Sequence, residues 1–563
     1  MNKWLLPILL MTVLPTGSVL HGRQTGPAGP GESVVLFSDR DLYIAGEQIL
    51  FSAFLIDREE ASDTLRSSVI YCELITPWGS MIAGNKFLVE NSRAEGTLSI
   101  PSDLITGTYF LRAYTRYMRN YGPYSYSYIK VKIINPYRDE VQEAAPDSRM
   151  TESPSDTFCI NNPDSLLHIS TGSQGYRQRD TVDILIEADP SFRSALKGLA
   201  MAVVPEASVS AGMIKISGRD QVESGQYHIT ESRGISITGK LTDTVTGRSL
   251  PYTRVNLSIL GKGKDFMAVQ TDTAGRFFFL LPDYTGHRDL FLCAEKAAGP
   301  DVAILIDNDF CSAPVMIPPG NPELSSPERL VAYRMAANLQ LASFYGADTI
   351  LPGSDDQGEE LAFYGTTDDI LYIDDYIELP TLEEYLNGLP TLVRVRKSKG
   401  QKYFKVLGTQ AGLNSFEPLV LIDMVAVDDP ARILAISPSD ISRIEVVNEM
   451  YLKGDETFGG IISIISRQGD FAGIDLPESG VFINYGFLSG KEHHIPPAPP
   501  EPNIPDTRNT LFWDPGIRLG DDGSARIKLT ASDMTGRYRI RLFGVSTEGE
   551  KILQTADFEV VRR

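Results

Sequence analysis

The chain has 563 residues, of which 42% are hydrophobic and 22% charged, enough for about three to five domains with their own cores. Its formal net charge is −21, from 73 acidic and 52 basic residues. Such a charge repels phosphate backbones, which argues against a nucleic acid partner, and it provides no overall attraction to anionic lipid.

Residues 1–22 have the pattern of a secretory signal peptide. Lys3 precedes an apolar run from Trp4 to Leu14, and small residues follow at Ser18 and Gly22. The run is shorter than the roughly 20 residues that span a bilayer. We therefore expect export and cleavage near Gly22, with a retained N-terminal anchor as the alternative.

Residues 33–136 contain short alternating strands separated by Gly, Pro and Asn, which predicts a β-sandwich. Three segments, FSDRDLYIAGEQILFSAFL, GTLSIPSDLITGTYFLRAYTRYMRN and IKVKIINP, resemble the macroglobulin-type domain of Bacteroidota envelope proteins. The resemblance covers about a hundred residues and implies the same sandwich that the alternation predicts.

Two further sandwiches are predicted next. Residues 158–233 alternate less regularly, as in TVDILIEAD and GLAMAVVPE, and indicate a second β-sandwich. Residues 235–315 hold ISITGKLTDTVTGRSLPYTRVNLSI and TDTAGRFFFLLP, which resemble the carboxypeptidase regulatory-like domain. That resemblance implies a small third sandwich and says nothing about chemistry.

A helical linker is predicted at 326–346. Ser326 is the expected N-cap, Pro327 suits the first helical position, and Gly346 can end the helix.

Residues 370–475 predict a small α/β domain, in which Thr381 and Glu384 have capping-box spacing ahead of a short helix. The segments LID, VDDP, SPSDI, IEV and GGII resemble the plug domain of TonB-dependent outer-membrane receptors, although Met424 stands where that family usually has Gly. Because the residues after Gly469 are too few for a receptor barrel, we expect a plug-like domain without its own pore.

Residues 508–563 follow a Pro-rich linker and predict a last sandwich, with a hairpin turn at Asp521-Asp522-Gly523. This segment resembles parts of alpha-2-macroglobulin-like proteins. The fold class is therefore mainly β, with tandem Ig-like or macroglobulin-like β-sandwiches and one α/β plug-like domain.

No enzyme motif emerges from the sequence. HExxH, GxSxG, Walker and dinucleotide patterns are absent, as is the Cys-Gly-Glu-Gln thioester of macroglobulin traps. We therefore predict no catalytic, cofactor-binding or metal-binding residues and no cofactor. The acidic pairs Asp368-Asp369 and Asp374-Asp375 suit either Ca²⁺ or solvent, and His493-His494 suits a solvated linker better than a metal.

Two sets of residues are candidates for other roles. Cys293 and Cys311 flank a turn between two strands that could pair, which places them within reach of a disulfide; two buried thiols are the alternative. Tyr451, Leu452 and Phe458 stand beside charges in the loop MYLKGDETF, which suits a docking surface for a partner. The alternative is a plug-like domain packed wholly within its own chain.

These features predict a non-enzymatic, exported protein of the periplasm or outer membrane. It would act as an interaction or scaffold component of a TonB-dependent or related complex, with an envelope protein as its partner. The alternative is a binding protein that captures a glycan or peptide for TonB-dependent uptake. Peripheral association with a membrane is left open.

Overall fold

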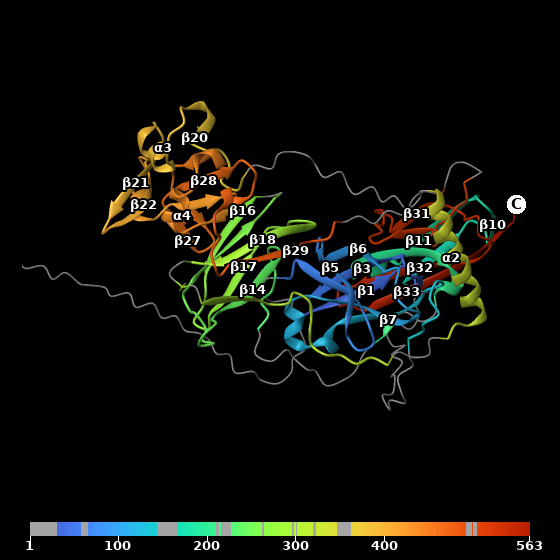
Figure 1. Ribbon diagram of the computed structural model, residues 1–563. Coiled ribbons are helices and arrows are strands. Elements are labelled where there is room, and N and C mark those ends of the chain that lie inside the picture. Colours follow the sequence, from blue (N-terminus) through green and yellow to red (C-terminus); the bar gives the residue numbers. More distant parts are fainter. Residues whose placement is uncertain are drawn as a thin grey trace, which may run out of the picture.

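The computed structural model describes residues 31–57, 66–142, 166–209, 213–214, 227–261, 264–295, 298–299, 301–318, 323–345, 362–490, 498 and 504–562. Within them the chain is mainly β, as predicted, and forms three β-sandwiches and one small α/β module (Figure 1). The predicted signal peptide, residues 1–22, lies outside the described residues. No described helix is long and apolar enough to span a membrane.

Apart from β13, the first sandwich lies in the segment predicted for it, 33–136, with β1 beginning one residue earlier. One sheet has the order β1-β3-β6, with bounds Glu32–Ser38, Gln48–Asp57 and Arg93–Ser99. The other has the order β13-β8-β7-β4-β5, with bounds Met213–Ile214, Ser127–Ile134, Gly107–Tyr114, Val69–Ile75 and Met81–Leu88; β2, Leu42–Ile44, also pairs with β8. Every residue of β4 is buried, because one face lines the core and the other meets the third sandwich.

The second sandwich corrects the predicted domains. One sheet has the order β31-β11-β9, with bounds Ser524–Thr530, Thr181–Ala188 and Leu167–Thr171. The other has the order β10-β33-β32-β12-β30, with bounds Gly175–Arg177, Lys551–Val561, Gly536–Ser546, Leu196–Pro205 and Phe512–Asp514. The segments 158–233 and 508–563, predicted as two sandwiches, thus build one with a shared core, because neither supplies enough strands to cover its own apolar face.

The third sandwich begins where it is predicted and ends far beyond it. One sheet has the order β17-β14-β19, with bounds Arg276–Leu280, Ser236–Asp243 and Val302–Ile306. The other has the order β16-β15-β18-β29, with bounds Asp265–Gln270, Arg254–Ile259, His287–Ala294 and Val481–Gly486. The edge strand β29 follows the α/β module in sequence and lies outside the predicted range 235–315.

The α/β module falls between those parts, and its first strand begins one residue before the predicted segment 370–475. Its mixed sheet has the order β20-β25-β28-β23-β24, with bounds Asp369–Tyr372, Ile441–Val447, Ile461–Ser466, Leu419–Ile422 and Val425–Ala426. Two short helices, α3 (Leu382–Gly388) and α4 (Pro430–Leu434), contribute to its core. Thr381 caps α3 as predicted, accepting a hydrogen bond from the amide of Glu384 at 3.3 Å. Two hairpins complete the module: β21–β22, Val393–Ser398 and Gln401–Val406, and β26–β27, Tyr451–Lys453 and Glu456–Phe458.

Helix α2, Ser326–Tyr345, forms at the predicted position. Its cap is Ser325 rather than Ser326: the amide of Glu328 donates to the Ser325 hydroxyl at 3.4 Å, and the amide of Ser325 donates to the Glu328 carboxylate at 2.8 Å. Ala332 and Met335 pack against Leu42 and Ile44 of β2. The helix therefore lies against the first sandwich.

The domains are nested rather than arranged in tandem. The chain completes the first sandwich except for β13, starts the second, starts the third, and folds the α/β module; β29 then closes the third sandwich and β30–β33 close the second. Figure 1 shows the result as an elongated molecule, with the α/β module in orange at one end and α2 at the other. On its C-terminal side the α/β module leads into β29 of the third sandwich, and on its N-terminal side the amide of Phe363 donates to the Lys264 carbonyl at 3.1 Å.

A buried polar junction joins the first and second sandwiches. Asp39 accepts hydrogen bonds from the hydroxyls of Tyr43 at 2.7 Å and Thr510 at 2.5 Å. Arg40 forms an ion pair with Glu47 at 2.8 Å, and Asn509 donates to the same carboxylate at 2.6 Å. Burial raises the pKa of Glu47 although Arg40 opposes the change. The FSDRDLYIAGE segment is thus tied to residues more than four hundred positions away.

A second buried junction joins the first and third sandwiches. Arg112 and Glu73 form an ion pair whose side chains are both fully buried, and Arg112 also donates to the carbonyl of Cys311 at 2.9 Å. Lys86 reaches across to Asp309 at 2.5 Å and to the carbonyl of Gly486 at 2.7 Å. Buried charges stay in such a site only when they are paired, so this contact fixes the two sandwiches in one arrangement.

Candidate functional site

The α/β module docks on the third sandwich through the hairpin β26–β27. Gly454 at its turn lies beside Ala268 of β16, and the amide of Asp455 donates to the Ala268 carbonyl at 3.0 Å. Lys453 forms an ion pair with Asp265 at 2.7 Å, while the rings of Phe266 and Phe458 lie 6.1 Å apart. The hairpin therefore acts as an internal contact between domains.

This contact accounts for two of the three residues that were predicted to dock a partner. Phe458 is buried in a core shared with Phe266 and Met424, and Tyr451 is half-buried, with its hydroxyl donating to the carbonyl of Phe363 at 2.9 Å. Burial also raises the pKa of Tyr451. Leu452 alone of the three predicted docking residues is exposed, at 69%. Tyr451 and Phe458 pack within the chain because the apolar face of the short hairpin is covered by β16.

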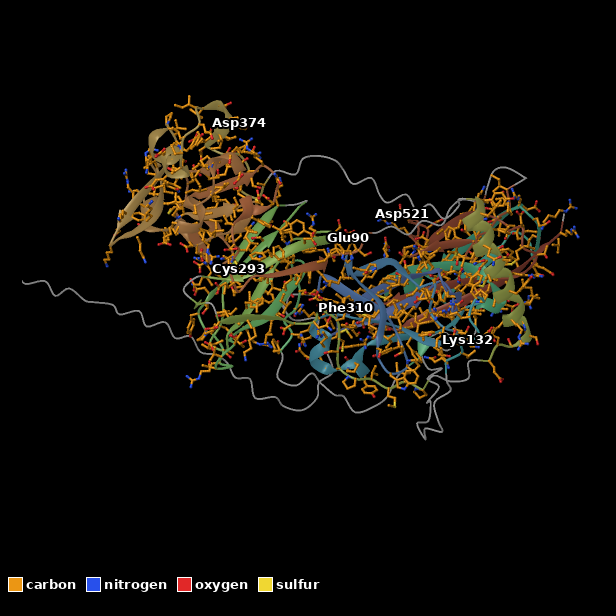
Figure 2. All side chains as sticks on the ribbon, viewed as in Figure 1. Glu90, Lys132, Cys293, Phe310, Asp374 and Asp521 are labelled. Atoms are coloured by element: carbon orange, nitrogen blue, oxygen red, sulfur yellow. The ribbon has the colours of Figure 1, made fainter. Side chains whose placement is uncertain are left out.

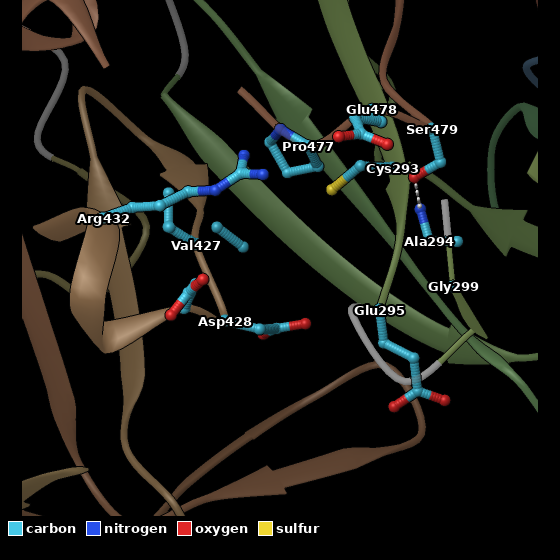
Figure 3. Close-up of a pocket in the computed structure, with 12 residues that line it drawn as sticks. Cys293, Ala294, Glu295, Gly299, Val427, Asp428, Arg432, Pro477, Glu478 and Ser479 are labelled. Atoms are coloured by element: carbon cyan, nitrogen blue, oxygen red, sulfur yellow. Dashed lines mark hydrogen bonds between the residues drawn. The ribbon is translucent and has the colours of Figure 1, made fainter. Parts of the chain in front are cut away.

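A pocket of about 250 Å³ lies at the same interface (Figure 3). It is lined by residues of both domains and of the segment that returns to β29: Cys293, Ala294, Glu295, Gly299, Ala426, Val427, Asp428, Asp429, Arg432, Pro477, Glu478 and Ser479. Its walls combine small apolar side chains with four carboxylates and one guanidinium. These positions are far apart in sequence, and no sequence signal groups them.

Charged residues beside this pocket also join the two domains. Arg254 of β15 donates to the Asp428 carboxylate at 2.7 Å, and the backbone amide of Arg254 donates to Glu295 at 3.1 Å. Burial lowers the pKa of the Arg254 guanidinium, but the Asp428 and Glu295 carboxylates outweigh burial and the pKa is raised. Arg432 donates to the carbonyls of Asp475 and Leu476 at 2.8 and 3.0 Å. The polar groups around the pocket are therefore mainly engaged in contacts within the protein.

Cys293 and Cys311 do not form the predicted disulfide. Cys293 lies in β18, whereas the chain leaves β18 and enters the opposite sheet as β19, so the two strands are not paired neighbours. Cys311 follows β19 in sequence and lies at the first sandwich, where the hydroxyl of Tyr126 donates to its sulfur at 3.3 Å. Figure 2 shows Cys293 and Phe310, which precedes Cys311, at different places in the molecule. Both residues are buried thiols, as is Cys72.

The thiol of Cys293 lines the pocket, but its environment does not activate it. Burial, followed by the nearby Asp428 carboxylate, raises the pKa of Cys293 to about 12. Because the thiolate is the nucleophilic form, Cys293 stays protonated and unreactive at neutral pH. The pocket therefore offers binding groups rather than an activated nucleophile.

Three of the four carboxylates in the acidic pairs accept hydrogen bonds from protein groups. Asp368 accepts from the amide of Asn448 at 2.9 Å, and Asp369 accepts from the amide of Leu392 at 2.9 Å. Asp374 forms a two-pronged pair with Arg467 at 2.6 and 2.9 Å, which lowers the pKa of Asp374. Across the described residues, no three His, Cys, Asp or Glu side chains gather in a way that could hold a metal ion. His493-His494 lies outside the described residues.

Comparisons with known proteins find similarity to solved structures only. No protein-family model matches the chain, and no curated protein matches it. The chain is similar to Salmonella alpha-2-macroglobulin reacted with methylamine, with 10% identity and a TM-score of 0.24 over 96% of this chain and 40% of that one.

Two further structures show comparable levels of similarity. Escherichia coli alpha-2-macroglobulin activated by porcine elastase gives 11% identity and a TM-score of 0.23, over 94% of this chain and 44% of that one. Dimeric latent PorU from Porphyromonas gingivalis gives 10% identity and a TM-score of 0.16, over 50% of this chain and 33% of that one. The chain thus spans about two fifths of the macroglobulins' length, and at these scores the similarity supports no conclusion about function.

Proposed function

We propose that this chain is a non-enzymatic, exported scaffold protein of a Gram-negative cell envelope. In this role it is an accessory component of an outer-membrane TonB-dependent or related complex, and the α/β module is the part that meets the partner. The resemblance of 370–475 to receptor plugs and of 33–136 to macroglobulin-type domains supports the envelope assignment. The pattern of residues 1–22 supports export.

One structural observation carries the proposal. Along the chain, the α/β module is inserted in the third sandwich, which is itself inserted in the second. Ionic contacts hold the module on the third sandwich, and another holds the third sandwich on the first. An insertion tied at both ends has less freedom to turn than a domain on a single linker. The arrangement therefore suits a protein that presents one domain in a fixed orientation at the end of a rod (Figure 1).

The test replaces residues 366–474 with a short Gly/Ser linker and measures co-purification from native membranes. Since β29 can still pair with β18, the three sandwiches should stay folded, which circular dichroism and thermal unfolding can check. We expect the envelope partner to be lost. Full recovery of that partner with folded sandwiches would show that the module is only a spacer.

A point variant tests which residue of the α/β module contacts the partner. Leu452 is the predicted docking residue that remains exposed, and Leu452→Ala should weaken co-purification several-fold if it lies in the contact. Val245→Ala, at a similarly exposed position of the third sandwich, is the matched control. Equal recovery of the partner with both variants would exclude Leu452 from the docking surface.

The pocket between the domains favours one alternative function, the capture of a small glycan or peptide for TonB-dependent uptake. Its volume of about 250 Å³ is below the roughly 300–1,000 Å³ typical of ligand sites, so it would take only a small part of such a ligand. Glu478→Trp, at an exposed position of its wall, would place an indole ring over it. Saturable ligand binding that this variant abolishes, with partner co-purification unchanged, would favour capture over scaffolding.

A further inference from the structure

The hairpin β21–β22 reverses the charge of the chain locally. Its strands and turn contain Arg394, Arg396, Lys397, Lys399, Lys402 and Lys405, and residues 385–416 contain no Asp or Glu. The whole chain has a net charge of −21, so this concentration of positive charge is an exception to its composition. We call residues 393–406 the basic hairpin.

The register of the basic hairpin separates an anchoring face from an exposed one. Val393, Val395, Phe404 and Val406 are buried in the core of the module. The opposite face pairs Arg394 with Lys405 and Arg396 with Tyr403, a residue that is 42% exposed. Lys399 and Gly400 form a tight turn with positive φ angles of 48° and 88°. The cations are thus carried on a well-anchored element that ends in an exposed tip.

Few of these cations have a partner within the protein. Lys402 forms an exposed ion pair with Glu383 at 2.5 Å, and Arg394 donates to backbone carbonyls, including that of Leu386 at 3.0 Å. No other described residue pairs with the remaining four, which are Arg396, Lys397, Lys399 and Lys405. The basic hairpin therefore has unused charge.

Repulsion between these charges also destabilises the pairing of β21 with β22. Arg394 lies directly opposite Lys405, and Lys397 lies directly opposite Lys402. Like charges at opposed positions destabilise a strand pair, and a two-stranded sheet has little stability to lose. Residues that break a local rule without a structural gain are characteristic of functional surfaces. An anion outside the chain would offset the repulsion between these like charges when it binds to them.

The shape and position of the basic hairpin indicate which kind of anionic partner it fits. It projects from the module at the end of the molecule, away from the sandwiches (Figure 1). A convex tip fits a flat surface better than a bound peptide, which needs a groove or a free strand edge with side-chain pockets. Tyr403 beside Arg396 adds an aromatic ring with a polar tip, the type of side chain favoured at membrane interfaces.

We propose that the basic hairpin docks the α/β module on the anionic phospholipid surface of a bilayer. Lys397 and Lys399 at the tip meet the lipid phosphates, and Tyr403 lies at the headgroup level. The acidic remainder of the chain does not cancel the attraction, because charges more than about 8 Å away are screened at physiological ionic strength. This binding goes beyond the proposed function and is independent of a protein partner.

Vesicle sedimentation of the full chain tests the proposal. The protein should bind phosphatidylcholine vesicles that contain phosphatidylglycerol, ignore vesicles of phosphatidylcholine alone, and be released by high salt. The double variant Lys397→Gln and Lys399→Gln should bind about 25-fold more weakly, since each basic residue near such a surface changes affinity about fivefold. The matched control, Arg526→Gln and Lys528→Gln, removes two exposed cations of the second sandwich and should bind like the wild type.

Three results would overturn the assignment. Binding that does not depend on anionic lipid would exclude electrostatic docking, and equal losses in both double variants would exclude the basic hairpin as its site. Binding to soluble poly-glutamate but not to vesicles would identify an acidic protein as the partner instead. Thermal unfolding of each variant confirms that a loss of binding is not a loss of fold.

Discussion

Asp39, Arg40 and Glu47 show what single residues in a local motif do once the chain is folded. In the sequence they belong to the segment FSDRDLYIAGE, which connects β1 to β3 and includes β2. In the structure they are buried and hold Asn509 and Thr510 of the returning chain. A local sequence pattern contains no information on a partner so distant in sequence.

The cysteines give a prediction at the residue scale. Because Cys72, Cys293 and Cys311 are buried thiols, none should react with iodoacetamide while the protein is folded. Burial raises the pKa of Cys72 and of Cys293, which slows alkylation further. After denaturation without a reductant all three should be alkylated, and peptide mass spectrometry identifies them. A Cys293–Cys311 peptide pair that appears only before reduction would contradict the structure.

Individual elements could be predicted well where the signal is local. The helix predicted at 326–346 matches α2 to within one residue. Thr381 caps α3, as its spacing with Glu384 indicates. Strand partners could not be predicted. The strand β29 lies between the predicted domains 370–475 and 508–563, since its pairing with β18 depends on a return of the chain that periodicity does not encode.

The docking of hairpin β26–β27 gives a prediction at the element scale. Gly454 has φ of +65°, and an added Cβ would lie 2.1 Å from the Ala268 carbonyl oxygen. Gly454→Ala should therefore destabilise the domain contact by about 2–4 kcal/mol, from backbone strain and steric overlap together. Hydrogen exchange should become faster in β16 and in the hairpin.

Gly400 provides the matched control for this variant. It has φ of +88° in the turn of the basic hairpin, with open space where a Cβ would stand. Gly400→Ala should cost about 1 kcal/mol from backbone strain alone. Exchange in β16 should stay at the wild-type rate. Unchanged exchange in β16 with Gly454→Ala as well would show that the hairpin does not hold the two domains together.

At the scale of the whole molecule, composition and strand spacing predicted a mainly β protein with several sandwiches and one α/β domain. They did not predict that the second and third sandwiches are completed by strands that follow the α/β module. Segments 166–209 and 504–562 each alternate like a separate domain, because alternation reports which face of a strand is buried and not which chain segment covers it. The pocket between the third sandwich and the α/β module was not predictable for the same reason.

The nested order of the domains is the central claim, and one cleavage experiment tests it directly. A protease site is placed in residues 499–503, the purified protein is cut, and the products are separated by size-exclusion chromatography without denaturant. Because β30–β33 complete the second sandwich, the C-terminal fragment should co-elute with the rest of the chain and separate only in denaturant. A folded C-terminal fragment that elutes alone would show that 508–563 is an independent sandwich and would contradict the nested architecture.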